Sequence, residues 1–242
     1  MKSNEVTRYI GLIDEVDTGF GMIREGLCQV IKLSRGIPYH LIIFLLLSNG
    51  FERIIKCLIV IHRKNQKFTD EEIFREMMKI KHGLKSLNTI LISILEEQKY
   101  AMKSSARNDD VIFLIQDMRL QKMLELFDQF GQGGRYYNLD LFIKGSSRYE
   151  DPKNIWNDLI EVLIQDHPEI WDKLMDPKTM KEGYHEMYLE FIKINSQYAR
   201  SLARLFTLAD FGEDAQRVSS SGTFFRNLRD EDIGKIEFCL KC

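Results

Sequence analysis

The segment from residue 41 to residue 63 constrains the fold of this chain most strongly. It begins with the apolar run LIIFLLL at 41–47 and continues with regularly spaced charged side chains. In a helix over 39–65, where successive residues turn by about 100°, the polar side chains share one narrow face. These side chains are Asn49, Glu52, Arg53, Lys56 and Arg63. Because 41–47 is apolar all round, we expect this half of the helix to be buried on most sides.

Apolar residues spaced three and four positions apart predict helices along most of the chain. Only 4 Pro and 15 Gly interrupt it, and no alternation of apolar and polar residues is long enough to build a sheet. We expect helices over 4–34, 39–65, 70–80, 83–103, 111–130, 152–166, 179–211 and 229–242. The predicted fold class is therefore all-α, an antiparallel helical bundle of six to eight helices.

Two loop regions suggest how the chain is organised into domains. Residues 1–218 are expected to form a single helical bundle domain, with 131–150 as the place of a possible subdivision. Within that loop, 135–140 is expected to be a turn or a short extended segment. The sequence Ser-Ser-Ser-Gly at 219–222 is typical of a flexible joint, so 219–242 is expected to be a joint followed by a tail helix.

Composition and charge exclude several classes of protein. Hydrophobic residues make up 44% and charged residues 29%, which is typical of a soluble globular chain. The net charge of −2 provides no global basic field, so nucleic-acid binding would need a local patch. The first residues lack the apolar stretch of a secretory signal, and three mid-span charges argue against 41–61 as a membrane span. We expect a cytoplasmic protein that does not associate with membranes.

The cysteines indicate neither a disulfide scaffold nor a metal site. Cys28 and Cys57 lie in apolar helical patterns, where cysteine usually acts as a small buried hydrophobe. Cys239 and Cys242 have the spacing of half a zinc site, but no second pair completes it. Phosphate-binding and dinucleotide-binding glycine patterns are also missing from the sequence. We therefore expect no metal and no cofactor.

The polar face of the 39–65 helix has two interpretations. It is either the solvated side of a long helix, where Glu52 and Lys56 form a favourable ion pair one turn apart, or a polar seam enclosed by a bundle or a dimer interface. Charges enclosed in a seam must be paired, and such charges often carry function.

Histidine and arginine together suggest phosphate chemistry at two places. Metal-independent helical ribonucleases use an Arg to stabilise phosphate charge and a His to transfer a proton. Arg35 with His40, and Arg75 with His82, are the candidate catalytic pairs. His62 lies on the apolar side of its helix and is expected to be a core or helix-end residue.

The helix that begins near residue 83 is a candidate phosphate site. Its first turn offers free N–H groups and the positive end of the helix dipole, and Lys81 and Lys85 add positive charge beside it. The alternative is that His82 caps this helix and packs against it.

A further candidate binding surface combines basic and aromatic side chains. Arg135, Tyr136 and Tyr137 are followed by Arg148 and Tyr149 in the same loop region. Such side chains stack on nucleic-acid bases and hold phosphates. Aromatic residues that tether a loop to the core would produce the same pattern.

The order of these features resembles the HEPN superfamily of helical proteins. The resemblance rests on Gly50-Phe51-Glu52-Arg53 with Lys56, on Lys81-His82-Gly83-Leu84 with Leu87, and on Arg135-Tyr136-Tyr137-Asn138-Leu139-Asp140. It implies an antiparallel bundle that often dimerises. Many members are RNA-cleaving enzymes in bacterial antiviral defence, abortive infection or toxin–antitoxin pairs, and others bind without catalysis.

The usual catalytic signature of that superfamily is an Arg, a polar residue, three further residues and a His. In this chain Arg35 is followed by Gly36, and Arg75 is separated from His82 by six residues. The sequence thus departs from the signature at both candidate pairs.

Three functional hypotheses follow from the sequence. The first is a HEPN-like homodimer that acts in nucleic-acid-linked defence or stress response by cleaving or binding RNA. The second is a non-enzymatic module that binds another protein through an exposed helix face. The third is the binding of a nucleotide or another small ligand in a pocket of the bundle, lined by the 49–56 face.

Overall fold

The computed structural model describes residues 3–33, 40–80 and 82–235. Every regular element in these ranges is helical, which confirms the prediction of an all-α fold. The α-helices are α1 (Ser3–Leu33), α2 (His40–Asn65), α3 (Asp70–Ile80), α4 (Leu84–Glu97), α5 (Ser105–Gln116), α6 (Met118–Gln132), α7 (Tyr137–Lys144), α8 (Pro152–Ile164), α9 (Pro168–Met175), α10 (Met180–Leu208), α11 (Glu213–Val218) and α12 (Thr223–Arg226).

The described ranges contain more helices than the six to eight expected, because the short helices α7, α9, α11 and α12 were not expected and two expected helices are divided. The expected helix at 83–103 ends as α4 at Glu97 and continues as a short 3-10 helix at Tyr100–Lys103. The helix expected at 111–130 is split at Asp117, whose side chain accepts hydrogen bonds from the N–H groups of Arg119 and Leu120 at 2.9 and 3.2 Å. This N-cap ends α5 and starts α6.

Helices α1 and α2 are antiparallel and approach each other closely through glycines. A Cβ atom on Gly50 would lie 2.7 Å from Ile23 Cγ1 and 2.9 Å from the carbonyl oxygen of Gly19. A Cβ atom on Gly26 would lie 2.7 Å from a Leu47 methyl carbon. The absence of side chains at these positions therefore allows the two backbones to come together.

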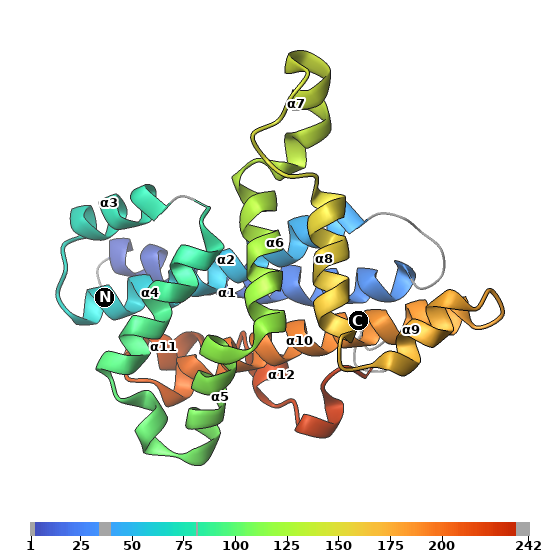
Figure 1. The fold of residues 1–242 in the computed structure, drawn as a ribbon. Helices are drawn as coiled ribbons and strands as arrows, with labels where there is room; N and C mark the ends of the chain where they lie inside the picture. Colours follow the sequence, from blue (N-terminus) through green and yellow to red (C-terminus); the bar gives the residue numbers. More distant parts are fainter. Residues whose placement is uncertain (1–2, 34–39, 81, 236–242) are drawn as a thin grey trace.

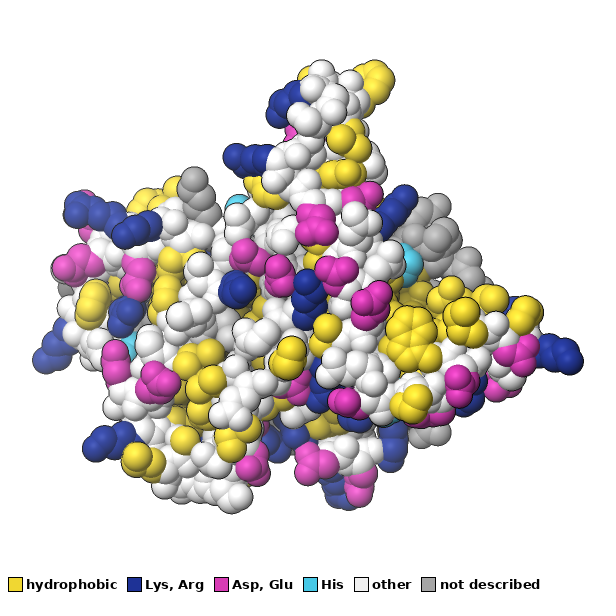
Figure 2. Space-filling view, in the orientation of Figure 1, with side chains coloured by type: hydrophobic (Ala, Val, Ile, Leu, Met, Phe, Trp, Pro, Cys, Tyr) yellow, Lys and Arg dark blue, Asp and Glu magenta, His cyan; other side chains and the backbone are white. Residues whose placement is uncertain are grey.

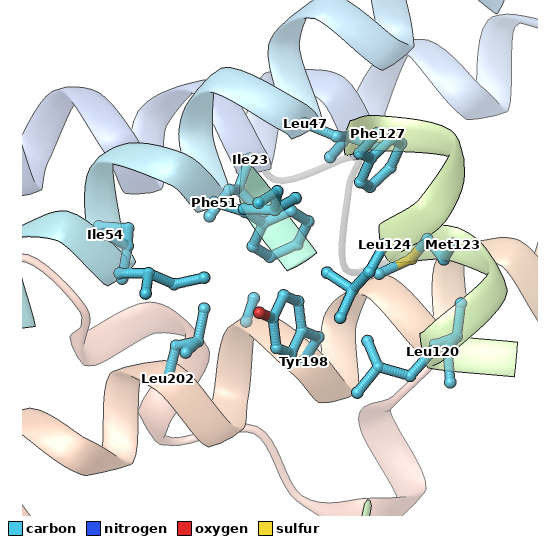
Figure 3. Close-up of a cluster of buried hydrophobic side chains, with 14 of the residues drawn as sticks. Ile23, Leu47, Phe51, Ile54, Leu120, Met123, Leu124, Phe127, Tyr198 and Leu202 are labelled. Atoms are coloured by element: carbon cyan, nitrogen blue, oxygen red, sulfur yellow. The ribbon is translucent and has the colours of Figure 1, made fainter. Parts of the chain in front are cut away.

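The centre of the core lies between α2, α6 and α10 (Figure 3). The Phe51 ring lies 4.7 Å from the Tyr198 ring and 6.2 Å from the Phe127 ring, measured between centroids. All three side chains have no measurable exposure to solvent. The hydroxyl of Tyr198 donates a 2.9 Å hydrogen bond to Asn88 Oδ1 on α4, so the one polar atom of this cluster is satisfied.

Figure 1 shows α6 and α8 side by side, running across the longer helices α1, α2 and α10. Helix α7 lies outside this layer and projects away from the rest of the molecule beyond the end of α6. No side chain of α7 is buried. Residues 135–140, expected to be a turn or an extended segment, instead belong to a 3-10 turn (Gly134–Tyr136) and to α7.

The first half of α2 is less buried than its composition suggests. Ile43, Phe44 and Leu47 face the core, whereas Leu41 and Ile42 are 49% and 50% exposed. The expectation that 41–47 is buried on most sides is therefore wrong. One side of this half-helix has no neighbour among the described residues.

The segment expected to be a flexible joint is a turn that packs against the core. A Cβ atom on Gly222 would lie 2.9 Å from the Phe20 ring and 3.2 Å from Ala203 Cβ. Phe225 of α12 is buried, 5.7 Å from the Phe20 ring. Beyond it the described chain contains a short 3-10 helix at Asp230–Asp232, and residues 236–242 lie outside the described residues.

Replacing Gly50 by alanine tests the close contact of α1 and α2. The new methyl group would overlap backbone atoms of α1, so we expect Gly50→Ala to lower the free energy of unfolding by about 1–3 kcal/mol. Gly21→Ala is the matched control, because a Cβ atom there meets nothing within 4 Å. It should raise the stability by about 0.5–1 kcal/mol through helix propensity. Urea denaturation of both variants measures this, and equal effects would contradict the close contact.

Candidate functional site

The polar face of α2 forms a half-buried seam whose charges are paired with neighbouring helices. Arg53 binds Glu15 of α1 at 2.6 Å, and Arg63 binds Glu76 of α3 with two nitrogen atoms. Asn49 donates a 2.8 Å hydrogen bond to the carbonyl oxygen of Leu45 within α2. The interpretation as a polar seam thus describes this face better than a freely solvated one.

In the middle of the seam, Glu52 contacts both His82, which lies before α4, and Lys56, which lies one turn later on α2. Its carboxylate lies 3.1 and 3.2 Å from Nδ1 of His82, in the segment before α4. It also accepts a 2.6 Å hydrogen bond from the ammonium group of Lys56. The Glu52 side chain is 12% exposed and that of His82 is 58% exposed. We call Glu52, Lys56 and His82 the Glu–His–Lys cluster.

The arrangement of the cluster favours one form of the imidazole. A carboxylate facing Nδ1 favours a proton on that nitrogen, which leaves Nε2 unprotonated in the neutral ring. The contact with the largely buried Glu52 carboxylate also holds the imidazole in one orientation. His82 can therefore act as a general base toward a molecule in the solvent, with Lys56 adding positive charge beside it.

The start of α4 carries a carboxylate in the place predicted for a phosphate. Asp128 of α6 accepts a 3.2 Å hydrogen bond from the N–H of Lys85, and burial raises the pKa of its carboxyl group. Gly83 is the N-cap residue, and because it has no side chain it cannot accept a hydrogen bond from the N–H groups at the helix start. The prediction that this helix start binds phosphate, or that His82 caps it, is corrected, since Asp128 takes that role.

The two candidate Arg–His pairs have different outcomes. Arg75 lies on the outer side of α3 with its side chain 71% exposed, and it pairs with Glu71 one turn earlier. His82 pairs with Glu52 instead, so the Arg75–His82 pair is not formed. Arg35 and Lys81 lie outside the described residues.

His40 lies in an aromatic cluster at the start of α2. Its ring is 4.9 Å from the Trp156 ring of α8, and its Nε2 lies 3.3 Å from the hydroxyl of Tyr188 on α10. Burial lowers the pKa of His40. His40 is therefore uncharged at neutral pH and contributes an apolar, aromatic surface.

A pocket of about 140 Å³ brings His40 together with part of the basic and aromatic cluster. Arg135 and Tyr137 both line it, although they are distant from His40 in sequence. Tyr136 points elsewhere and lines a separate groove at the base of α7, with the Arg135 guanidinium 5.1 Å from its ring centroid. We call the first of these the aromatic pocket.

Several residues of these sites were missed in the sequence. Asp128 lies on the predicted 111–130 helix without any distinguishing pattern around it. Lys153 and Trp156 also line the aromatic pocket. The sequence signal that could have identified them is the presence of a basic and an aromatic residue in the first two turns of the helix that begins after Asp151. Their relation to His40 depends on the tertiary packing of α8 against α2.

Residues 3–33, 40–80 and 82–235 contain neither a group of metal-binding side chains nor a membrane-spanning helix. No group of three or more His, Cys, Asp and Glu side chains there is arranged to hold a metal ion. None of the helices in that part of the chain is both long and apolar enough to span a membrane.

The buried histidines predict how stability depends on pH. Burial lowers the pKa of both His40 and His62 in the folded chain. Below about pH 6.5 the unfolded chain therefore binds more protons at these positions than the folded chain does. The free energy of unfolding should be highest above that pH and should fall as the pH decreases. In urea denaturation between pH 7 and pH 5, His62→Gln should show a smaller fall than the wild type, and an equal fall would contradict the assignment.

The chain matches no protein-family model, no curated protein and no solved structure.

Proposed function

We propose that this protein acts on RNA, with the Glu–His–Lys cluster as a metal-independent cleavage site. The observation that carries the proposal is the contact of His82 Nδ1 with both carboxylate oxygens of Glu52 while the imidazole remains largely exposed. The resemblance to HEPN proteins supports the same class of substrate and suggests a role in nucleic-acid-linked defence or stress response.

The chemistry of the cluster suits cleavage at a ribose. His82 Nε2 takes the proton of a 2′-hydroxyl group, and the resulting oxygen attacks the adjacent phosphorus. The bond from phosphorus to the 5′-oxygen breaks, and that oxygen takes a proton from a water molecule. His82 Nε2 then returns its proton to the hydroxide that remains, which restores the neutral imidazole. The products are a 2′,3′-cyclic phosphate and a 5′-hydroxyl end. Lys56 offsets the charge that develops on the phosphate oxygens.

Single-residue variants test the cleavage site. We expect His82→Ala to lower the rate of cleavage of a single-stranded RNA by about 100-fold or more, because a general base contributes about 10²–10⁴-fold. Glu52→Gln should also lower the rate, because an amide can face Nδ1 with its NH2 group and then no longer fixes the proton on that nitrogen. Cleavage is measured on end-labelled RNA, with the cyclic phosphate identified by mass spectrometry.

Matched controls make this test specific. His185→Ala changes a half-buried histidine of α10 outside the cluster, and Arg75→Ala removes the arginine that the sequence paired with His82 but that pairs with Glu71 in the structure. His185→Ala and Arg75→Ala should both cleave the RNA at the wild-type rate. DNA of the same sequence should not be cleaved, because it lacks the 2′-hydroxyl. Unchanged cleavage in His82→Ala, or cleavage of the DNA, would contradict the proposal.

We further propose that the protein forms a homodimer through α7. The side chains of Phe142 and Ile143 are 88% and 65% exposed on this projecting helix, and Figure 2 shows apolar side chains gathered there. A groove of about 650 Å³ at its base is lined by Tyr136, Leu139 and Ile143 together with polar side chains, which include Asp140, Lys144 and Arg148. Projection and groove belong to the same segment, so two copies related by a two-fold axis can exchange them.

The oligomeric state of surface variants tests the dimer. Phe142→Ser should shift the protein from dimer to monomer in sedimentation velocity at micromolar concentration, because it removes the largest exposed apolar side chain of the contact. Phe74→Ser is the control, since Phe74 of α3 is also largely exposed, at 64%. A monomeric wild type, or dissociation in Phe74→Ser alone, would contradict the use of α7.

A further inference from the structure

The aromatic pocket lies where the start of α2, the turn before α7 and the start of α8 meet. Its apolar lining includes Phe44, Trp156 and Pro152, together with the His40 ring. The rings of Phe44 and Trp156 are 5.4 Å apart, and those of His40 and Trp156 are 4.9 Å apart. Trp156 is therefore held on two sides, so that this wall of the pocket is rigid.

The size of the pocket selects a class of occupant. Its volume is about 140 Å³, and apolar cavities of about 150 Å³ accept a molecule of the size of benzene. Aromatic walls favour a flat ring, which can stack or meet a ring edge at these distances. One aromatic ring therefore fits the space, and a larger group would have to extend out of the mouth.

The charges at the pocket select the second part of the ligand. Arg135 and Lys153 both line it, and neither forms an ion pair with a carboxylate in the described part of the chain. Asp151 also lines the pocket, but its Oδ1 is engaged by the N–H of Lys153 as the N-cap of α8, at 2.9 Å. The Arg135 guanidinium lies over the Tyr136 ring, but no carboxylate of the described residues neutralises Arg135 or Lys153, so the two cations next to the aromatic pocket are suited to an anion.

We infer that the aromatic pocket binds a planar aromatic ring that carries one anionic group, with the ring against Trp156 and Phe44 and the anion at Arg135 and Lys153. Both a nucleoside monophosphate and an aromatic carboxylate have this chemistry. The binding site shares no residue with the Glu–His–Lys cluster, so the inference does not rest on the proposed RNA cleavage.

The charge of His40 is consistent with a pocket that has apolar walls for the ring and separate cations for the anion. Since burial lowers its pKa, the ring is neutral at pH 7 and belongs with the apolar walls. Its Nε2 is already engaged at 3.3 Å with the Tyr188 hydroxyl. The positive charge that meets the anion therefore comes from the exposed Arg135 and Lys153 side chains at the mouth.

Tryptophan fluorescence gives a direct readout. The chain has 2 Trp residues, so the surface substitution Trp171→Phe leaves Trp156 as the single reporter. We expect 5′-AMP or benzoate to change the Trp156 emission saturably. Adenosine, benzamide and inorganic phosphate should bind at least about tenfold more weakly, because each provides only one part of the ligand. Comparison of 5′-AMP with benzoate identifies the source of the anion.

Charge variants locate the anion. In the Trp171→Phe background, Arg135→Ala and Lys153→Ala should each weaken the binding of the preferred anion about tenfold. Arg148→Ala is the matched control, because Arg148 also lies over a tyrosine, with its guanidinium 4.7 Å from the Tyr149 ring centroid, but does not line this pocket. It should bind like the parent protein.

Three results would overturn the inference. One is the absence of a saturable change with both 5′-AMP and benzoate. Another is binding of adenosine and benzamide as tight as that of their anionic counterparts. The third is an equal loss of affinity in Arg148→Ala and Arg135→Ala, which would assign the effect to general surface charge. None of these outcomes depends on whether the protein cleaves RNA.

Discussion

The close contact of α1 and α2 is the constraint on which the rest of the structure depends. Because Gly19 and Gly50 have no side chains, the two helices can approach until the backbone of α2 at Gly50 contacts Ile23 and the backbone of α1 at Gly19. This contact fixes the rotation of α2 about its own axis. With that rotation set, Phe51 faces α6 and α10, and the polar face of α2 is directed toward the side where the segment before α4 passes.

Core and candidate site are coupled through neighbouring residues of α2. Phe51 packs against Tyr198 in the core, and the next residue, Glu52, holds His82. A turn of α2 about its axis would therefore move both side chains together. The rigid packing of Phe51 thus holds the Glu52 carboxylate in place, as a general base requires of its supporting group.

The parts of the structure that depend on local sequence could be predicted from it. The extent of α1 and α2 follows from their apolar spacing, and the start of α3 follows from a local capping box, in which Glu72 Oε2 accepts the Thr69 N–H at 2.8 Å. The parts that were missed depend on tertiary placement. Nothing near Asp128 in the sequence indicates that it meets the start of α4, and the exposure of Leu41 depends on which neighbours α2 has there.

The site could be predicted to a similar extent. Glu52, Lys56 and His82 were candidates because of their residue types and positions, and the fold brings them together. The predicted pair of Arg75 and His82 does not form, because Arg75 lies on the exposed side of α3 and pairs with Glu71. Closeness in the sequence does not ensure that two side chains face each other. That His40 and Arg135 line one pocket could not be derived from the sequence, because the two residues come together only where the start of α8 packs across the start of α2.

The lack of any buried side chain in α7 has a consequence for how this protein can change over time. Substitutions in most of the chain are limited by the stability of a shared core, whereas those in α7 alter a surface with little cost to folding. Residues 137–144 can therefore diverge rapidly while the rest of the fold is retained. If α7 forms the proposed dimer contact, chains that share this core would differ in that contact, and exchange of this one helix would exchange it.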